Sequence, residues 1–336
     1  MDLSDHNARS AVPQCKPGNG RDRDVTLLSR IPLVMDVDTG TDDAVCIAAA
    51  TLCTDRIELL GIGAVCGNVE IEKTARNTLD LIDFLGCEAP VHIGASRPLA
   101  RPLCTAVSHG TTGLGDVALP AARRGFAEGG VTELIHGAAK RHPGGLEILA
   151  VGPLTNIATA LTECPELLAL IKRITIMGGA IRGGNMTLAS EFNLYCDPEA
   201  ARIVFESGCA LTMVGLDVTL KPELPRHIFD RIRAAPGPQA DVVARVLDFM
   251  MRRKDEFGAD DPNLHDVIAL AAIVKPSLFT FESYYVHLET GGEVTRGMTI
   301  ADFNNVSKRP PNAVVAVDID ADGFWDWFVD LFGAGK

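Results

Sequence analysis

Short apolar runs alternate with longer segments of helical spacing over the first two thirds of the chain. The apolar runs are expected strands, at Ile31–Met35, Ile57–Val65, Leu146–Val151, Ile174–Met177 and Leu211–Leu216. The segments between them are expected helices, at Asp43–Cys53, Glu70–Leu85, Thr155–Thr162 and Pro198–Ser207. Short strands separated by helices are typical of a parallel sheet that is covered on both faces. The pattern therefore predicts an α/β fold with a mostly parallel central sheet flanked by helices.

The last third of the chain has a different pattern, in which helices follow one another directly. Three successive helices, which predict a helical cap, are expected at Pro225–Arg233, Asp241–Phe257 and Asp266–Val274. One or two further strands are expected, over Tyr284–Leu288 and Gly297–Phe303. The aromatic cluster at 324–328 predicts a helix that packs on the body. Residues 1–28 are polar and rich in turn formers, so we expect a mobile extension followed by one α/β domain over 29–336.

The composition narrows the classes of function. The chain has 336 residues, of which 47% are hydrophobic and 22% charged, so a sizeable core is expected. Its net charge of −13 argues against nucleic acid or an anionic membrane as a partner, because both require a basic face. No apolar run reaches the about 18 residues of a membrane span, and none precedes Val25 as a secretory signal requires. Nine scattered cysteines without a C-x-x-C spacing make a disulfide framework and a zinc site weak interpretations, and we expect a cytoplasmic protein.

The sharpest local feature is an acidic cluster directly after the first expected strand, Asp36-Val-Asp38-Thr-Gly-Thr-Asp42-Asp43. Carboxylates so close together repel one another, so such a cluster usually requires a cation or takes up a proton. Oxygen ligands on a glycine-containing turn favour a hard ion, Ca²⁺ or Mg²⁺. Alternatively, Thr41 caps a helix and the last two acids lie in its first turn, where the helix dipole stabilises them. That alternative leaves Asp36 and Asp38 unexplained, so a metal site is the preferred interpretation.

Turns with polar residues or glycine follow the other expected strands. They are Asn68 after the second strand, Gly152-Pro153-Leu154-Thr155-Asn156 after the strand that ends at Val151, Met177-Gly178-Gly179 at the end of the next, and Asp217 after the one that follows. Each such residue taken alone is more often a simple turn residue. Because open α/β sheets bind ligands outside the carboxyl ends of their strands, these turns together predict a single cleft.

The motifs together resemble those of a known family. The segment from Asp36 to Ala44 resembles the N-terminal signature of the nucleoside hydrolases of the inosine–uridine-preferring type. Further matching motifs follow in register: Gly67-Asn68-Val69, His109-Gly110-x-x-Gly113-Leu114-Gly115, Gly152 to Asn156, Met177-Gly178-Gly179 with Asn185, Glu191-Phe192-Asn193, and His265-Asp266. The resemblance covers roughly residues 31–305. It implies a nucleoside hydrolase-like fold with a Rossmann-like core, and a homodimer or homotetramer.

The resemblance also implies roles for individual residues. A Ca²⁺ ion would be held by the side chains of Asp38, Asp43 and Asp266 and the backbone carbonyl of Val151. The substrate-binding residues would be Asp42, which holds ribose hydroxyls, Asn68, which orients the water, Met177 on the ribose face, and Asn185, Glu191, Phe192 and Asn193 around the sugar. His109 and His265 would face the nucleobase.

These residue types fit the hydrolysis of an N-glycosidic bond, which passes through an oxocarbenium-like ribosyl cation. A water held by Ca²⁺ would attack C1′, and Asp38 would take its proton. Carboxylates around the sugar would stabilise the developing positive charge. The imidazole of His265 or His109 would protonate the leaving base. The predicted function is Ca²⁺-dependent hydrolysis of ribonucleosides, with a small-molecule nucleoside as the partner.

Two alternatives stay open at this point. A Mg²⁺ phosphatase of the haloacid-dehalogenase type would use Asp36-Val-Asp38 as its nucleophile motif. In such phosphatases Gly-Thr usually follows the second Asp directly, whereas here Thr39 stands between Asp38 and Gly40. A ribosyl-binding relative without catalysis would retain the fold but not turn over. Two departures from the family also matter. Thr39 stands where relatives often have proline, and the segment 257–264 has one aromatic residue where relatives often place tyrosines, which leaves the base preference open.

Overall fold

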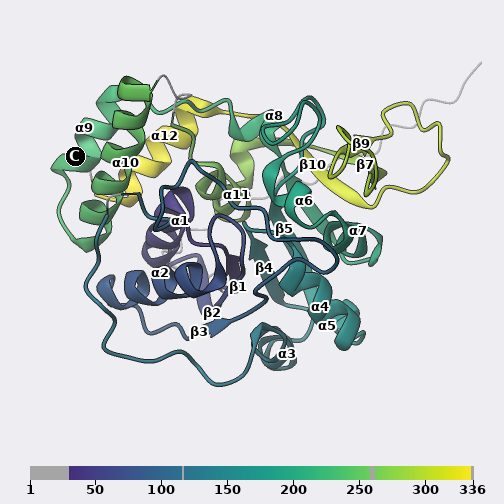
Figure 1. Cartoon of the computed structure of the whole chain (residues 1–336), viewed down its shortest axis with the longest axis horizontal. Helices are drawn as coiled ribbons and strands as arrows, with labels where there is room; N and C mark the ends of the chain where they lie inside the picture. The colour runs from purple at the N-terminus through teal and green to yellow at the C-terminus, as the bar shows by residue number, and fades with distance from the viewer. Residues whose placement is uncertain (1–29, 116, 258–261, 334–336) are drawn as a thin grey trace, which may run out of the picture.

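The central element of the fold is an eight-stranded sheet. A computed structural model describes residues 30–115, 117–257 and 262–333, so the expected extension at 1–28 lies outside it. The sheet has the order β3-β2-β1-β4-β5-β6-β10-β7 (Figure 1). Its strands are β1 (Ile31–Val37), β2 (Ile57–Ala64), β3 (Val91–Ile93), β4 (Leu146–Ala150), β5 (Ile171–Met177), β6 (Leu211–Val214), β7 (Phe279–Tyr284) and β10 (Ala313–Ile319). All neighbours pair in parallel except β7, which runs antiparallel to β10.

Helices cover both faces of the sheet (Figure 1). Those that share one apolar core are α1 (Thr41–Leu52), α2 (Ile71–Phe84), α9 (Arg226–Ala234), α10 (Pro238–Phe257), α11 (His265–Val274) and α12 (Ala321–Leu331). Those in the second core are α3 (Val131–Arg141), α4 (Thr155–Glu163), α5 (Leu167–Leu170) and α7 (Pro198–Glu206). Strand β1 serves both cores, because Leu33 and Met35 face the first and Val34 the second.

Short elements complete the fold around the carboxyl edge of the sheet and beside it. They are α6 (Phe192–Cys196), α8 (Leu216–Thr219), the 3-10 turn η1 (Pro276–Leu278), and the antiparallel pair β8 (Val286–Leu288) and β9 (Thr299–Ala301). Among the described residues, no helix combines the length and the apolar character needed to cross a membrane.

The observed fold confirms the predicted α/β class and the mostly parallel sheet. Each apolar run predicted as a strand in the first two thirds overlaps an observed strand. The aromatic cluster at 324–328 lies in α12, with Phe324 and Phe328 fully buried. The expected strands at 284–288 and 297–303 contain β8 and β9, and the three successive helices expected after residue 225 correspond to α9, α10 and α11. The prediction missed α3, the short helices α5, α6 and α8, and the strands β3, β7 and β10. β3 is only three residues long, and β7 is an exposed edge strand, so neither carries a long apolar run.

Candidate active site

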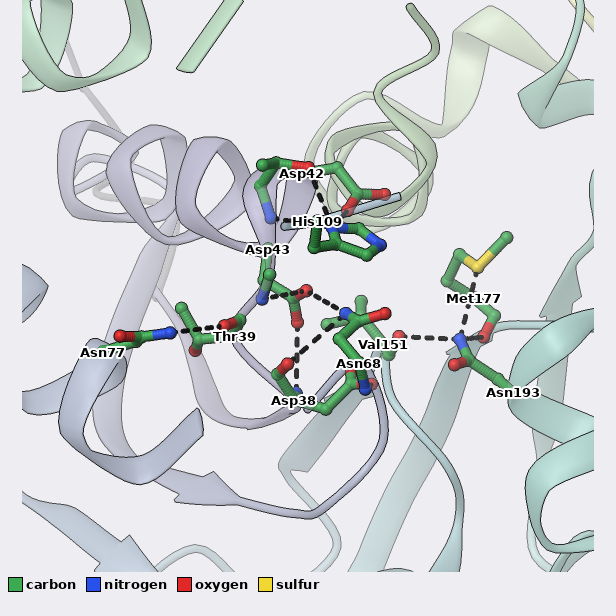
Figure 2. A network of polar contacts seen from close by, with 12 residues as sticks. Asp38, Thr39, Asp42, Asp43, Asn68, Asn77, His109, Val151, Met177 and Asn193 are labelled. Atoms are coloured by element: carbon green, nitrogen blue, oxygen red, sulfur yellow. Dashed lines mark hydrogen bonds and ion pairs between the residues drawn. The ribbon is translucent and has the colours of Figure 1, made fainter. Parts of the chain in front are cut away.

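Loops from neighbouring strands meet at the carboxyl edge of the sheet, as the sequence predicts (Figure 2). Asp38 follows β1, and Asn68 follows β2. The backbone N–H of Asn68 donates to Asp38 Oδ2 at 2.7 Å, and its side-chain amide donates to Asp43 Oδ2 at 3.1 Å. Asn68 therefore connects the loop after β2 to the acidic cluster after β1.

The turn between β1 and α1 brings the acids together. Asp43 accepts hydrogen bonds from the backbone N–H groups of Asp38 at 3.1 Å and Gly40 at 2.9 Å. The alternative interpretation, in which Thr41 caps this helix, is wrong on the cap: Gly40 is the N-cap, and Thr41 is the first helical residue. Asp42 and Asp43 do lie in the first turn of the helix, as that alternative expected. A side chain at Gly40 would place Cβ 2.6 Å from both Asn68 Nδ2 and His109 Nδ1, so the packing of the turn requires glycine.

Buried carboxylates from two helices and one strand end converge in the cleft. Oxygen atoms of Asp42, Asp43 and Asp266 lie within 4.8 Å of one another. Asp38 Oδ1 and Asp266 Oδ2 are buried and have no hydrogen-bond partner among the described residues. Asp38 and Asp266 also interact electrostatically. A hard cation requires buried oxygen ligands that no hydrogen-bond donor occupies, and Asp38 Oδ1 and Asp266 Oδ2 meet this requirement. The donor set therefore fits the Ca²⁺ implied by the sequence resemblance.

The same geometry raises the pKa values of the carboxyl groups in this cluster. Burial raises the pKa of Asp42 to about 6, and burial together with the charge of Asp42 raises the pKa of Asp43 to about 7. Burial, followed by repulsion from neighbouring acids, raises the pKa values of Asp38 and Asp266 well above their usual range. A dication in the cluster would reverse these shifts, because it stabilises the ionised carboxylates.

Asp36, the first acid of the motif, lies in β1, two residues before Asp38. Its Oδ1 accepts a hydrogen bond of 2.7 Å from the side chain of Asn156, which also donates to the carbonyl of Ala64 in β2. The Asn156 side-chain oxygen in turn accepts from the N–H of Ala95. Asp36 and Asn156 therefore join β1 and β2 to the loop after β3, and support the floor of the cleft.

The strands β4 and β5 supply the other side of the cleft. The side-chain amide of Asn193 donates to the carbonyl oxygens of Val151 at 2.8 Å and Met177 at 3.1 Å (Figure 2). Glu191 is the N-cap of α6 and accepts from the N–H groups of Asn193, Leu194 and Gly179. Burial raises the pKa of Glu191 to about 7. This helix end thus holds Val151, Met177 and Asn193 in one place.

The two remaining predicted sugar residues are Asn185, in the loop between β5 and α6, and Phe192, the first residue of α6. Asn185 is exposed, and its Oδ1 accepts from the N–H of Phe192 at 2.9 Å. Asp217, in α8, accepts from the N–H groups of Ile181 at 2.6 Å and Arg182 at 3.2 Å. Asp217 thereby orders the start of the loop that carries Asn185. The contacts of Asn185 and Asp217 thus order this loop.

His109 has a fixed tautomer. Its Nδ1 accepts from the N–H of Thr41 at 3.0 Å and lies 2.9 Å from the Thr41 hydroxyl. Because a backbone N–H can only donate, the ring proton belongs on Nε2. Burial lowers the pKa of His109 to about 4, so the ring is neutral at pH 7. Its Nδ1 also lies 3.9 Å from Asp42 Oδ1, which places this histidine against the acidic cluster.

His265 begins α11, directly before Asp266. Its Nδ1 lies 2.8 Å from the hydroxyl of Thr219 in α8, and burial lowers its pKa to about 4. Both histidines are therefore neutral at pH 7 and offer a hydrogen-bond donor rather than an imidazolium. Sequence reasoning missed Thr41 and Thr219 as partners of the histidines, because neither threonine carries a local signal for a contact so distant along the chain.

Comparison with known proteins gives consistent matches over most of the chain. The family described as "Inosine-uridine preferring nucleoside hydrolase" matches residues 33–326. The pyrimidine-specific ribonucleoside hydrolase RihA of Salmonella agona is 41% identical over 300 residues, which are 88% of this chain and 96% of that protein. RihA of Citrobacter koseri is 42% identical over 302 residues, with the same coverage.

A solved structure shares the fold. The purine-preferring ribonucleoside hydrolase from Gardnerella vaginalis has a TM-score of 0.83 and 33% sequence identity, and the match covers 91% of this chain and 99% of that one. The plant nucleoside hydrolase PpNRh1 has the same TM-score with 26% identity, over 90% of this chain and 98% of its own.

Proposed function

Because the chain belongs to the inosine-uridine preferring nucleoside hydrolase family and is a ribonucleoside hydrolase, we propose that it is Ca²⁺-dependent and acts on pyrimidine ribonucleosides. The observation that carries the metal dependence is the buried carboxylate cluster with its unpartnered oxygens. The base preference is supported by the identity of 41% to a pyrimidine-specific relative, against 33% to a purine-preferring one. The phosphatase alternative loses its support, since the family match spans residues 33–326.

In this proposal the ion is bound by Asp38, Asp43, Asp266 and the carbonyl of Val151. All four offer oxygen, and Asp38 Oδ1 and Asp266 Oδ2 lack other partners among the residues described. When bound, Ca²⁺ lowers the pKa of a coordinated water and holds the ribose hydroxyls.

Side chains of the protein carry out the proton transfer and bind the water and the sugar. Asp38 takes one proton from the attacking water, and the oxygen of that water forms the bond to C1′. The C1′–N bond breaks with its electron pair going to the base, which then takes up a proton from solvent, while Asp38 returns its proton to solvent. Asn68, already bonded to Asp38 and Asp43, orients the water. Asp42 binds a ribose hydroxyl. Met177, Asn185, Glu191, Phe192 and Asn193 enclose the sugar.

The two histidines act differently in this proposal. His265 donates a hydrogen bond from Nε2 to the departing base. Its Nδ1 then carries no proton and accepts from the Thr219 hydroxyl, which lies 2.8 Å away. A neutral imidazole is suited to this role, because it polarises the base without bringing a positive charge beside the ribosyl cation. His109 is a positioning residue, because its ring binds the N–H of Thr41 at the start of α1 and lies 3.9 Å from Asp42, so it supports the turn that carries the acids.

The reaction is tested by following product formation from uridine, cytidine, inosine, guanosine and adenosine. We expect free base and ribose, with uridine and cytidine hydrolysed fastest. EDTA should abolish turnover, and Ca²⁺ should restore it. Activity that survives chelation in a protein without bound metal contradicts the metal dependence. Faster hydrolysis of the purine nucleosides contradicts the base preference alone.

The assignment of metal ligands is tested by calorimetric Ca²⁺ titration of D42N and D43N, two neighbouring buried acids. Asp43 is a ligand in this proposal and Asp42 is not, so D43N should lose at least about 10-fold in Ca²⁺ affinity. D42N should retain Ca²⁺ affinity within a few-fold but bind ribose poorly, which raises KM. Equal losses of Ca²⁺ affinity in both variants would make Asp42 a ligand.

Assembly and location belong to the same proposal. We propose a homodimer or homotetramer, which the molar mass in solution tests, and a cytoplasmic location, which cell fractionation tests. Eight described cysteines are free thiols, which suits a reducing compartment.

A further inference from the structure

A second group of side chains with metal-binding chemistry lies away from the cleft, where α3, α4 and α5 pack together (Figure 1). His136 lies on α3, Cys164 is the C-cap of α4, and Glu166 is the N-cap of α5. His136 Nε2 lies 2.9 Å from Glu166 Oε1. One ligand atom from each of the three residues lies within 4.8 Å of the other two. Three helices thus bring a nitrogen, a sulfur and an oxygen to one point.

The surroundings of this group are acidic. Glu163 at the end of α4 and Glu133 in the first turn of α3 both act on the thiol of Cys164, together with Glu166, while Lys140 opposes them. Desolvation and these carboxylates raise the pKa of the Cys164 thiol. The same negative field attracts a dication, which in turn stabilises the thiolate.

The group is also accessible from solvent. The side chain of His136 is 25% exposed and that of Glu166 55% exposed. An ion can therefore reach the three ligand atoms, and a water can occupy the fourth position of a tetrahedral site. The active-site cluster differs on both points, because its acids are buried and its donors are all oxygen.

We propose that His136 Nε2, Cys164 Sγ and a Glu166 carboxylate oxygen bind a Zn²⁺ ion, with water as the fourth ligand. Mixed nitrogen, sulfur and oxygen donors select a borderline ion such as Zn²⁺ over Ca²⁺. Binding releases the Cys164 thiol proton to solvent. The proton on Nε2 of His136, which donates to Glu166 in the metal-free protein, also leaves, and the metal-bound imidazole carries its ring proton on Nδ1. The site is independent of the proposed reaction. Spacing along the chain gave no sign of it, because His136 lies 30 positions before Glu166.

The test is a Co²⁺ titration of the full chain, stripped of metals by chelation and then kept in excess Ca²⁺ to occupy the active-site carboxylates. Co²⁺ reports the site because a thiolate ligand adds a charge-transfer band to its spectrum. We expect one equivalent of bound Co²⁺, displaced by Zn²⁺, and a charge-transfer band that C164S abolishes. H136A should lower Co²⁺ affinity by more than about 10-fold.

The matched control is C87S, since Cys87 is also a partly buried free thiol but belongs to no such cluster among the described residues. C87S should retain the band and the affinity of the wild type. A band that persists in C164S, or failure of the wild type to bind Co²⁺ in excess Ca²⁺, overturns the proposal. C164S and H136A should hydrolyse nucleosides at the wild-type rate, so this outcome is separate from that of the proposed reaction.

Discussion

Replacing Asp38 with asparagine is expected to reduce kcat/KM for uridine by more than about 1,000-fold. Two functions are lost together, because the carboxylate is both the proposed base and a proposed ligand of Ca²⁺. A general base alone typically contributes about 10²–10⁴-fold, and the loss of a ligand weakens the activation of water further. The measurement is the rate of ribose release at saturating Ca²⁺, with Ca²⁺ affinity determined in parallel by calorimetry.

The melting temperature of D38N distinguishes a loss of catalysis from unfolding of the variant. The pKa of Asp38 is raised in the folded protein, so its ionisation destabilises the metal-free fold as pH rises above the unfolded value of about 4. D38N removes this buried charge. In EDTA at pH 8, its melting temperature should therefore equal or exceed that of the wild type. The exposed Asp55 offers a control, and D55N should leave both rate and melting temperature unchanged. A D38N enzyme with more than a tenth of wild-type activity contradicts the assigned role.

The carboxyl edge of the sheet could be predicted from sequence because its signals are local. Asp38, Asp42 and Asp43 follow an apolar run directly, and Asn68 follows the next one, so the rule for parallel sheets brings them together. The structure places them as expected, with Asn68 bonded to both Asp38 and Asp43. The same rule predicts the neighbourhood of Val151 and Met177, which Asn193 joins by two hydrogen bonds.

Contacts between distant segments could not be predicted in this way. The sequence places Asn156 in a motif that follows a strand, yet its side chain donates a hydrogen bond to Asp36, 120 positions away. Thr219 contacts His265 through the packing of α8 on α11, and a threonine in a four-residue helix has no pattern of its own. The neutral state of both histidines likewise depends on burial, which only the packed structure reveals.

Replacing His265 with alanine is expected to slow uridine hydrolysis by about 100-fold, while hydrolysis of p-nitrophenyl riboside changes only a few-fold. Uridine needs a hydrogen bond to its departing base, whereas p-nitrophenolate leaves without help. Since the pKa of His265 is lowered to about 4, the ring stays neutral from pH 5 upward. The pH profiles of wild type and H265A should therefore run parallel above pH 5. The ratio of the two hydrolysis rates should show no step near the ordinary histidine pKa of about 6.5.

His109 provides the comparison that separates donation from positioning. Loss of its ring frees the N–H of Thr41 beside Asp42, which disturbs the acidic cluster whatever the leaving group is. H109A should therefore slow uridine and p-nitrophenyl riboside in equal proportion. If H109A is the selective variant and H265A the uniform one, the two roles are exchanged. Equal losses on both substrates in both variants would leave neither histidine as the donor, and the pyrimidine base would then depart without a hydrogen bond from either imidazole.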